Sequence, residues 1–167
     1  MFNYFIIPLV TVCTFQLTVT DFSKTYVTVC SVLFLVFLFG ASGLISLNIW
    51  QFWPRSDLYD SLKNLLVYGT FYNTYREKNL QFFVVHLYSN ILRGIAFGAL
   101  QPSGIAQITI LAAIEIVLIL TIYGVKPFAS PTSMNLWHVL FSFIRLLTVL
   151  LMMAFVPSIN ASAAVKS

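Results

Sequence analysis

Two long apolar runs joined by a short turn constrain the fold of this chain more than any other feature. The runs cover residues 82–100 and 105–125, and QPSG at 101–104 joins them. Each run is about 20 residues long, the length at which an apolar helix crosses the hydrocarbon core of a bilayer. The sequence therefore predicts a transmembrane helical hairpin, around which the other elements are expected to pack.

Three further apolar runs predict additional spans. Residues 27–50 and 136–156 are each long enough to cross a bilayer, whereas residues 2–19 form a shorter run interrupted by Pro8. Hydrophobic residues make up 59% of the chain and charged residues 8%. A soluble domain carries about 25% charged residues. We therefore expect an all-α polytopic membrane bundle of about five spans, in a single transmembrane domain that covers residues 1–167.

A long polar segment, residues 51–80, separates the second predicted span from the third. Its leucines recur at helical spacing on one face: Leu58, Leu62, Leu65 and Leu66. This pattern predicts an amphipathic helix on the membrane surface, which Gly69 is expected to end. Two interpretations stay open, because the segment can serve as a surface anchor or as a linker that couples movement between groups of helices.

Basic residues in the loops indicate how the chain is oriented. One side of the five-span arrangement carries most of them: Arg55, Lys63, Arg76, Lys78 and Lys126. Cytoplasmic loops carry an excess of Lys and Arg, so this side is expected to face the cytosol. The turn at 101–104 and the C-terminus then face the lumen or the exterior. The net charge of +4 is thus explained by membrane orientation, and we expect a lipid bilayer rather than nucleic acid as partner.

Polar side chains recur at helical spacing within each of the last three predicted spans. An ionisable residue inside a membrane is costly unless it is paired or meets water. These polar faces are therefore expected to turn inward and to form a polar core or a gate. Its expected members are Asn90 and Arg93 in the third span, Gln107 and Glu115 in the fourth, and Arg145 in the fifth.

The depth of the three charges can be counted from the loops. Arg93 lies about 9 residues and Glu115 about 12 residues from the turn near Pro102, an offset of roughly 4–5 Å. Glu115 and Arg145 each lie about 15 residues from the next loop, so they are nearly level. Glu115 can therefore pair with either arginine, with Arg145 slightly favoured. Such a pair belongs to a gate or ion pathway in one interpretation and only fixes helix packing in the other.

Other motifs point to packing rather than chemistry. Gly94 and Gly98 form a small-xxx-small pair, which is typical of close helix packing. His86 and His138 are expected to be interfacial polar residues rather than metal ligands or pH sensors. The acidic residues are scattered, and the sequence contains no paired-carboxylate set, nucleophile elbow or nucleotide-binding glycine loop. We therefore expect no enzyme activity, no catalytic residues, no metal site and no cofactor.

Several short motifs together resemble a known family. They are YGTFYNTYR at 68–76, RGIAFGALQPSGIAQ at 93–107, Glu115, KPF at 126–128 with Asn135, and Arg145. This series resembles the membrane region of the fungal TRP-like channels, the flavin carrier family, although Lys126 stands where the family motif has Arg. The motif residues are Tyr68, Gly69, Tyr72, Tyr75, Arg76, Gly94, Gln101, Ser103, Gly104, Gln107, Lys126, Pro127, Phe128 and Asn135.

The resemblance implies a function as well as a fold. Family members are integral proteins of the endoplasmic reticulum or plasma membrane, linked to calcium homeostasis and to transport of FAD into the endoplasmic reticulum. FAD is implied only as a transported solute. The implied partners are further copies of the chain or other transmembrane segments of a longer protein. Because family members are several times longer, we expect a fragment or truncated paralogue, and a non-conducting structural or assembly subunit is the alternative function.

Overall fold

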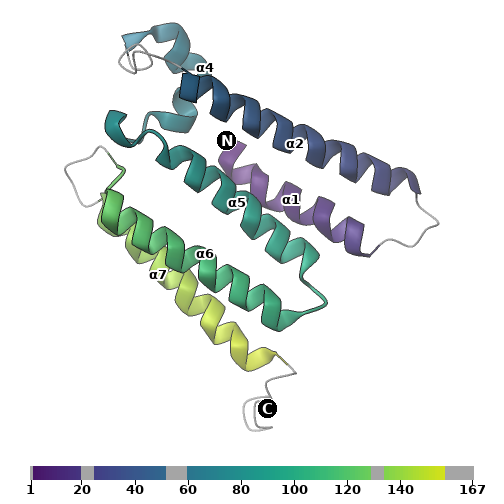
Figure 1. Cartoon of the computed structure of the whole chain (residues 1–167). Coiled ribbons are helices and arrows are strands. Elements are labelled where there is room, and N and C mark those ends of the chain that lie inside the picture. Colours follow the sequence, from purple (N-terminus) through teal and green to yellow (C-terminus); the bar gives the residue numbers. More distant parts are fainter. Residues whose placement is uncertain (1, 20–24, 52–59, 129–133, 157–167) are drawn as a thin grey trace.

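The computed structural model describes residues 2–19, 25–51, 60–128 and 134–156, which are almost entirely helical (Figure 1). The long helices are α1 (Phe2–Thr18), α2 (Thr25–Gln51), α5 (Phe82–Ala99), α6 (Gly104–Val125) and α7 (Met134–Leu151). The shorter elements are α4 (Leu62–Tyr72) and the 3-10 helices η2 (Glu77–Asn79) and η3 (Met152–Phe155). The expected all-α membrane bundle is confirmed.

Within the described residues, four helical stretches are long and apolar enough to cross a membrane. They are α2, α5, α6, and α7 together with η3. α1 has 17 residues and contains Pro8. At about 1.5 Å per residue it extends roughly 25 Å, against about 30 Å of hydrocarbon. α1 nevertheless lies beside α5 (Figure 1), so its position in the bundle is that of the first predicted span. That it crosses a bilayer stays a prediction.

α1 and α5 pack closely because two glycines let their backbones approach. A Cβ atom added at Gly94 would lie 2.8 Å from the Cβ of Val10, and one added at Gly98 would overlap Thr14 Oγ1. The hydroxyl of Thr11 also donates a hydrogen bond to the carbonyl oxygen of Gly94, at 3.2 Å. The contacts advance in the same direction along both helices, so α1 and α5 are parallel. The glycine pair thus serves helix packing, as its spacing predicts.

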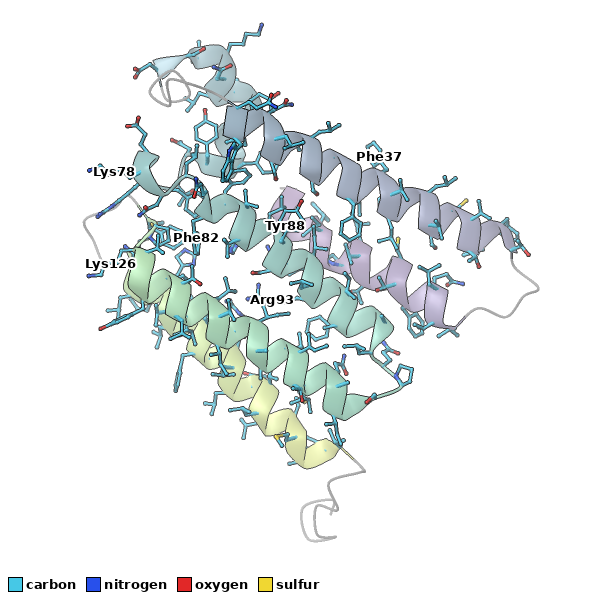
Figure 2. The ribbon with its side chains drawn as sticks, in the orientation of Figure 1. Phe37, Lys78, Phe82, Tyr88, Arg93 and Lys126 are labelled. Atoms are coloured by element: carbon cyan, nitrogen blue, oxygen red, sulfur yellow. The ribbon has the colours of Figure 1, made fainter. Side chains whose placement is uncertain are left out.

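Buried apolar side chains form two clusters. One joins α1, α2 and α5 and contains Ile6, Val10, Leu38, Leu87 and Ile91. The other lies where α2 and α6 end and α5 begins, and contains Ile49, Tyr72, Tyr75, Leu80, Phe82, Phe83, Leu118, Ile122 and Phe128. Other large apolar side chains of α2 point outward, such as Phe37, which is 68% exposed (Figure 2). Such a surface suits lipid tails, which are as apolar as leucine.

The structure corrects the predicted end of the surface helix. α4 does not stop at Gly69 but continues to Tyr72, and the N–H of Asn73 bonds to the carbonyl oxygen of Gly69 at 2.9 Å. A glycine inside a helix costs about 1 kcal/mol relative to alanine. Burial of the large Tyr72 side chain, which is fully buried, offsets this cost and holds the extra turn in place.

The leucine face of the surface helix is only partly described. Leu62 and Leu66 are more than two-thirds exposed, whereas Leu65 is half-buried. Two exposed leucines one turn apart are what a helix lying on a membrane presents to the lipid. Leu58, which belongs to the predicted leucine face, and Arg55, which was counted for the orientation, lie outside the described residues.

Candidate functional site

The three ionisable residues expected to meet within the membrane form one charge cluster of Arg93, Glu115 and Arg145. Oε1 of Glu115 lies 2.7 Å from Nη2 of Arg93 and accepts a hydrogen bond from its Nε at 2.9 Å. The same oxygen accepts a hydrogen bond from Nε of Arg145 at 3.1 Å. Glu115 therefore bridges both arginines. Arg93 makes the closer contact, although the heights counted from the loops slightly favoured Arg145. The long side chain of Arg93 spans the small difference in height between it and Glu115.

Each arginine is also held by a polar residue of its own helix. Nη1 of Arg93 donates a hydrogen bond to Oδ1 of Asn90 at 2.7 Å, and Nη2 of Arg145 donates one to Oγ of Ser142 at 2.8 Å. Asn90 and Ser142 are both buried. These bonds fix the direction in which each guanidinium group points. Ser142 thus belongs to the polar core, although only its spacing from Arg145 indicated this in the sequence.

The charge cluster is unevenly buried. The side chains of Arg93 and Glu115 are 8% and 4% exposed, whereas that of Arg145 is 47% exposed. Oε2 of Glu115 is buried and has no hydrogen-bond partner among the described residues. Removing one partner from a buried ion pair costs about 3–5 kcal/mol, because the remaining charge stays desolvated. Glu115 is therefore the member on which the other two depend.

The charge cluster lines a cavity of about 920 Å³ between the α1–α5 pair and the α6–α7 pair. Figure 2 shows Arg93 on the side of α5 that faces α6. Among the described residues that line the cavity, Glu115 is the only acidic one. The polar lining residues are Thr74, Tyr75, His86, Asn90, Arg93, Glu115, His138, Arg145 and Thr148.

Gln107 does not line this cavity with the other predicted core residues. It is half-buried, two turns closer to the start of α6 than Glu115. At 3.6 residues per turn, the eight positions between them rotate the side chain by roughly 80° around the helix. Gln107 therefore faces a different direction from Glu115, and the structure does not bring it to the charge cluster.

Several motif residues meet at one end of the cavity, in a loop junction of Tyr75, Arg76, Pro127, Phe128 and Asn135. Tyr75 and Phe128 form an isolated antiparallel bridge. The backbone N–H of Arg76 donates to the carbonyl oxygen of Pro127 at 2.8 Å, and its Nε donates to that of Phe128 at 3.1 Å. The N–H of Phe128 donates to Oδ1 of Asn135 at 3.2 Å. Three separate motifs of the sequence are thereby joined.

Aromatic contacts connect the loop junction to the cavity. The ring of Phe128 lies 5.4 Å from that of Tyr75 and 6.1 Å from that of Phe82. It also stacks on the imidazole of His138 at 4.0 Å, with the planes only 8° apart. Burial raises the pKa of Tyr75 to about 12. The junction is therefore packed like a protein core, and its aromatic rings form part of the cavity wall.

Lys126 directs the chain from α6 into the loop junction. It adopts a left-handed conformation with φ 48°, which is uncommon for a residue with a side chain. Its N–H bonds to the carbonyl oxygen of Ile122 at 3.0 Å, and Pro127 follows at once. α6 therefore ends at Val125, the last residue of the span predicted from the sequence, because Pro127 cannot continue a helix without losing a backbone hydrogen bond.

The remaining motif residues lie away from the charge cluster. Gln101 and Ser103 are exposed in the turn between α5 and α6, and Gly104 begins α6. Tyr68, Gly69 and Tyr72 belong to α4. In the part of the chain that the structure describes, no group of three His, Cys, Asp or Glu residues could hold a metal ion.

Comparison with known proteins gives a family match over the full length. Residues 1–167 match the profile of the family described as the transient receptor potential (TRP) ion channel. An uncharacterized membrane protein of Schizosaccharomyces pombe, C1322.03, is 32% identical over 107 residues. The match covers 64% of this chain and 12% of the yeast protein, so the chain corresponds to a small part of that relative. No solved structure matches the chain significantly.

Proposed function

This chain belongs to the transient receptor potential ion channel family, and from this premise we propose that the charge cluster gates its polar cavity. The carrying observation is that one carboxylate on α6 holds arginines of both α5 and α7. α5 packs most extensively on α1, and α6 packs most extensively on α7. The Arg93–Glu115 pair thus crosses the more thinly packed boundary between two helix pairs, where relative movement meets the least resistance.

The cavity is large enough to hold water as well as a solute. A volume of about 920 Å³ corresponds to roughly 30 water molecules at about 30 Å³ each. Water in contact with Arg145 would lower the cost of placing this charge within the membrane. In the proposed mechanism, breaking the Arg93–Glu115 pair lets the two helix pairs separate and widens the cavity into a path.

The finer parts of the proposal follow the family resemblance. We propose that the chain lies in the membrane of the endoplasmic reticulum or in the plasma membrane. Its proposed role there is in calcium homeostasis or in transport of FAD into the endoplasmic reticulum. α4 is proposed to act as a coupling linker, because it leads directly into the loop junction at the cavity wall. The exposed apolar surfaces of α2 and α7 are proposed to meet other transmembrane segments or further copies of the chain.

The test is the flux of calcium and of FAD through vesicles that contain a known amount of purified protein. Glu115→Gln keeps the size of the side chain but removes the charge that holds both arginines. We expect higher basal flux per molecule, because the boundary between the helix pairs loses its ion pair. Glu77→Gln is the matched control, since Glu77 is exposed in η2 and lies outside the cavity lining.

Two outcomes would contradict gating by the charge cluster. Equal flux per molecule in Glu115→Gln and in the unchanged chain would refute it. Lower abundance with unchanged flux per surviving molecule would support the alternative, in which the charges only fix packing in a non-conducting structural subunit. Arg145→Gln provides a milder second variant, because it leaves the buried Arg93–Glu115 pair intact. It should leave basal flux close to that of the unchanged chain, because the Arg93–Glu115 pair that closes the boundary persists.

A further inference from the structure

The cavity carries more positive than negative charge. Arg93 and Arg145 both line it, and Glu115 supplies the one negative charge among its described lining residues. His86 and His138 add ring nitrogens and no negative charge. The lining is surrounded by apolar helices, where charges interact more strongly than in water. A guest that enters the cavity therefore meets an excess of positive charge and of hydrogen-bond donors.

The two arginines keep donors that the carboxylate does not occupy. Both engage the same oxygen of Glu115, and Arg145 uses only Nε for this contact and Nη2 for Ser142. Nη2 of Arg93 is buried and makes a charge contact with Glu115 but no aligned hydrogen bond. A guanidinium group has five N–H donors in a planar fork, which matches the oxygens of a phosphate. Unused donors thus remain on a buried and on a half-exposed arginine.

The cavity lining offers few hydrogen-bond acceptors. Oε2 of Glu115 is buried without a hydrogen-bond partner among the described residues, so it can accept from a P–O–H group or from water. A bare divalent cation prefers six or more oxygen ligands, several of them charged. The one carboxylate here is already shared by two guanidinium groups. The lining therefore favours an oxyanion over a calcium ion.

We propose that the cavity is a binding site for a phosphate group, held by Arg145 and Arg93. The phosphate belongs either to a lipid headgroup or to a soluble phosphate-bearing molecule, since both present the same oxygens. The inference deepens the proposed function, because it names the chemical class that the gated cavity accepts. Binding itself is independent of gating, so equilibrium binding can succeed where a flux experiment fails.

The test uses the full chain, purified in a maltoside detergent without phospholipid, and two probes. Inorganic phosphate reports the soluble source and short-chain phosphatidic acid reports the lipid source, each followed by calorimetry and by thermal stabilisation. We expect saturable binding of at least one probe. Arg145→Gln should weaken it about tenfold, which corresponds to about 1.4 kcal/mol. Lys78→Gln removes the same charge from exposed η2 and should leave binding unchanged.

Glu115→Gln should have opposite effects on the binding of a phosphate and on the binding of a cation. Removing the negative charge should tighten phosphate binding, whereas it would abolish binding of a cation that depends on the carboxylate. A calcium-binding signal that disappears in Glu115→Gln would overturn the proposal. Failure of both phosphate probes to bind, or equal binding by Arg145→Gln and the unchanged chain, would overturn it as well. Arg145→Gln is suited to this test because Arg145 is half-exposed and the buried pair persists without it.

Discussion

Replacing Gly98 with alanine should push α1 away from α5. The added Cβ would overlap Thr14 Oγ1 and the carbonyl oxygen of Thr11, and would lie 2.9 Å from the backbone nitrogen of Phe15. Non-bonded carbon atoms pack at about 3.5–4.0 Å. Rotating the Thr14 side chain cannot relieve the overlap, because the other two atoms belong to the backbone of α1. The whole helix must therefore move by roughly 1 Å.

The expected loss of stability follows from opposing contributions. Alanine favours a helix over glycine by about 1 kcal/mol, which would stabilise the variant if the site were open. Overpacking costs about 1–3 kcal/mol and more where backbone must move. The shift would also stretch the hydrogen bond from Thr11 to Gly94, now 3.2 Å, worth about 0.5–1.5 kcal/mol. We therefore expect Gly98→Ala to lower the free energy of unfolding by about 2 kcal/mol or more.

Thermal unfolding in detergent, followed by tryptophan fluorescence, would measure this loss against two other glycine variants. Gly94→Ala should lose less stability than Gly98→Ala but more than Gly43→Ala, because its new Cβ would lie 2.8 Å from the Cβ of Val10. Gly43→Ala on α2 is the matched control, since no atom lies within 4 Å of the Cβ it would add. If Gly98→Ala unfolds at the same temperature as Gly43→Ala, α1 does not pack on α5 as described. The description of the cavity wall that α1 forms would then be wrong as well.

Two further predictions concern the loop junction. Asn135→Ala should lower stability by about 1 kcal/mol in thermal scans, because the Phe128 N–H loses its acceptor. Asn135→Asp keeps an acceptor and should stay close to the unchanged chain, so an equal loss in both would contradict the hydrogen bond. Burial raises the pKa of Tyr75 from its ordinary 10.0 to about 12, so the folded state favours the neutral phenol. Stability is therefore retained below pH 10 and falls as the pH rises toward 12. Tyr75→Phe should weaken this alkaline loss in denaturant titrations, and an unchanged pH profile would argue against burial of the phenol.

The charge cluster could be predicted from the sequence because a bilayer restricts its helices. Spans that cross the same hydrocarbon layer share a common rise per residue, so distance from a loop converts into height. Counting in this way placed Glu115 nearly level with Arg145 and roughly 4–5 Å from the height of Arg93, and both ion pairs are present. Height alone does not fix direction around the helix axis, which explains why Gln107 was expected in the core and lies elsewhere.

The loop junction could not be predicted, because no periodic pattern marks it. Its contacts join residues about 50 positions apart through irregular backbone. The left-handed conformation of Lys126 could not be predicted either, because the residue that usually adopts it is glycine and this position is a lysine. Similarly, the continuation of α4 past Gly69 depends on a pocket for Tyr72 that other segments build. Local sequence rules describe each segment separately, and these features exist only where the segments meet.

The loop junction also connects α4, the predicted surface helix, to the charge cluster. α4 ends at Tyr72, and the chain then reaches Tyr75, whose backbone pairs with Phe128. Phe128 stacks on His138 of α7, the same helix that carries Arg145. Coupling between distant sites needs an element with two arrangements that both sites bias. The carboxylate of Glu115 meets this requirement in the proposed gate, since a small shift of α7 would change how it is shared between the two arginines.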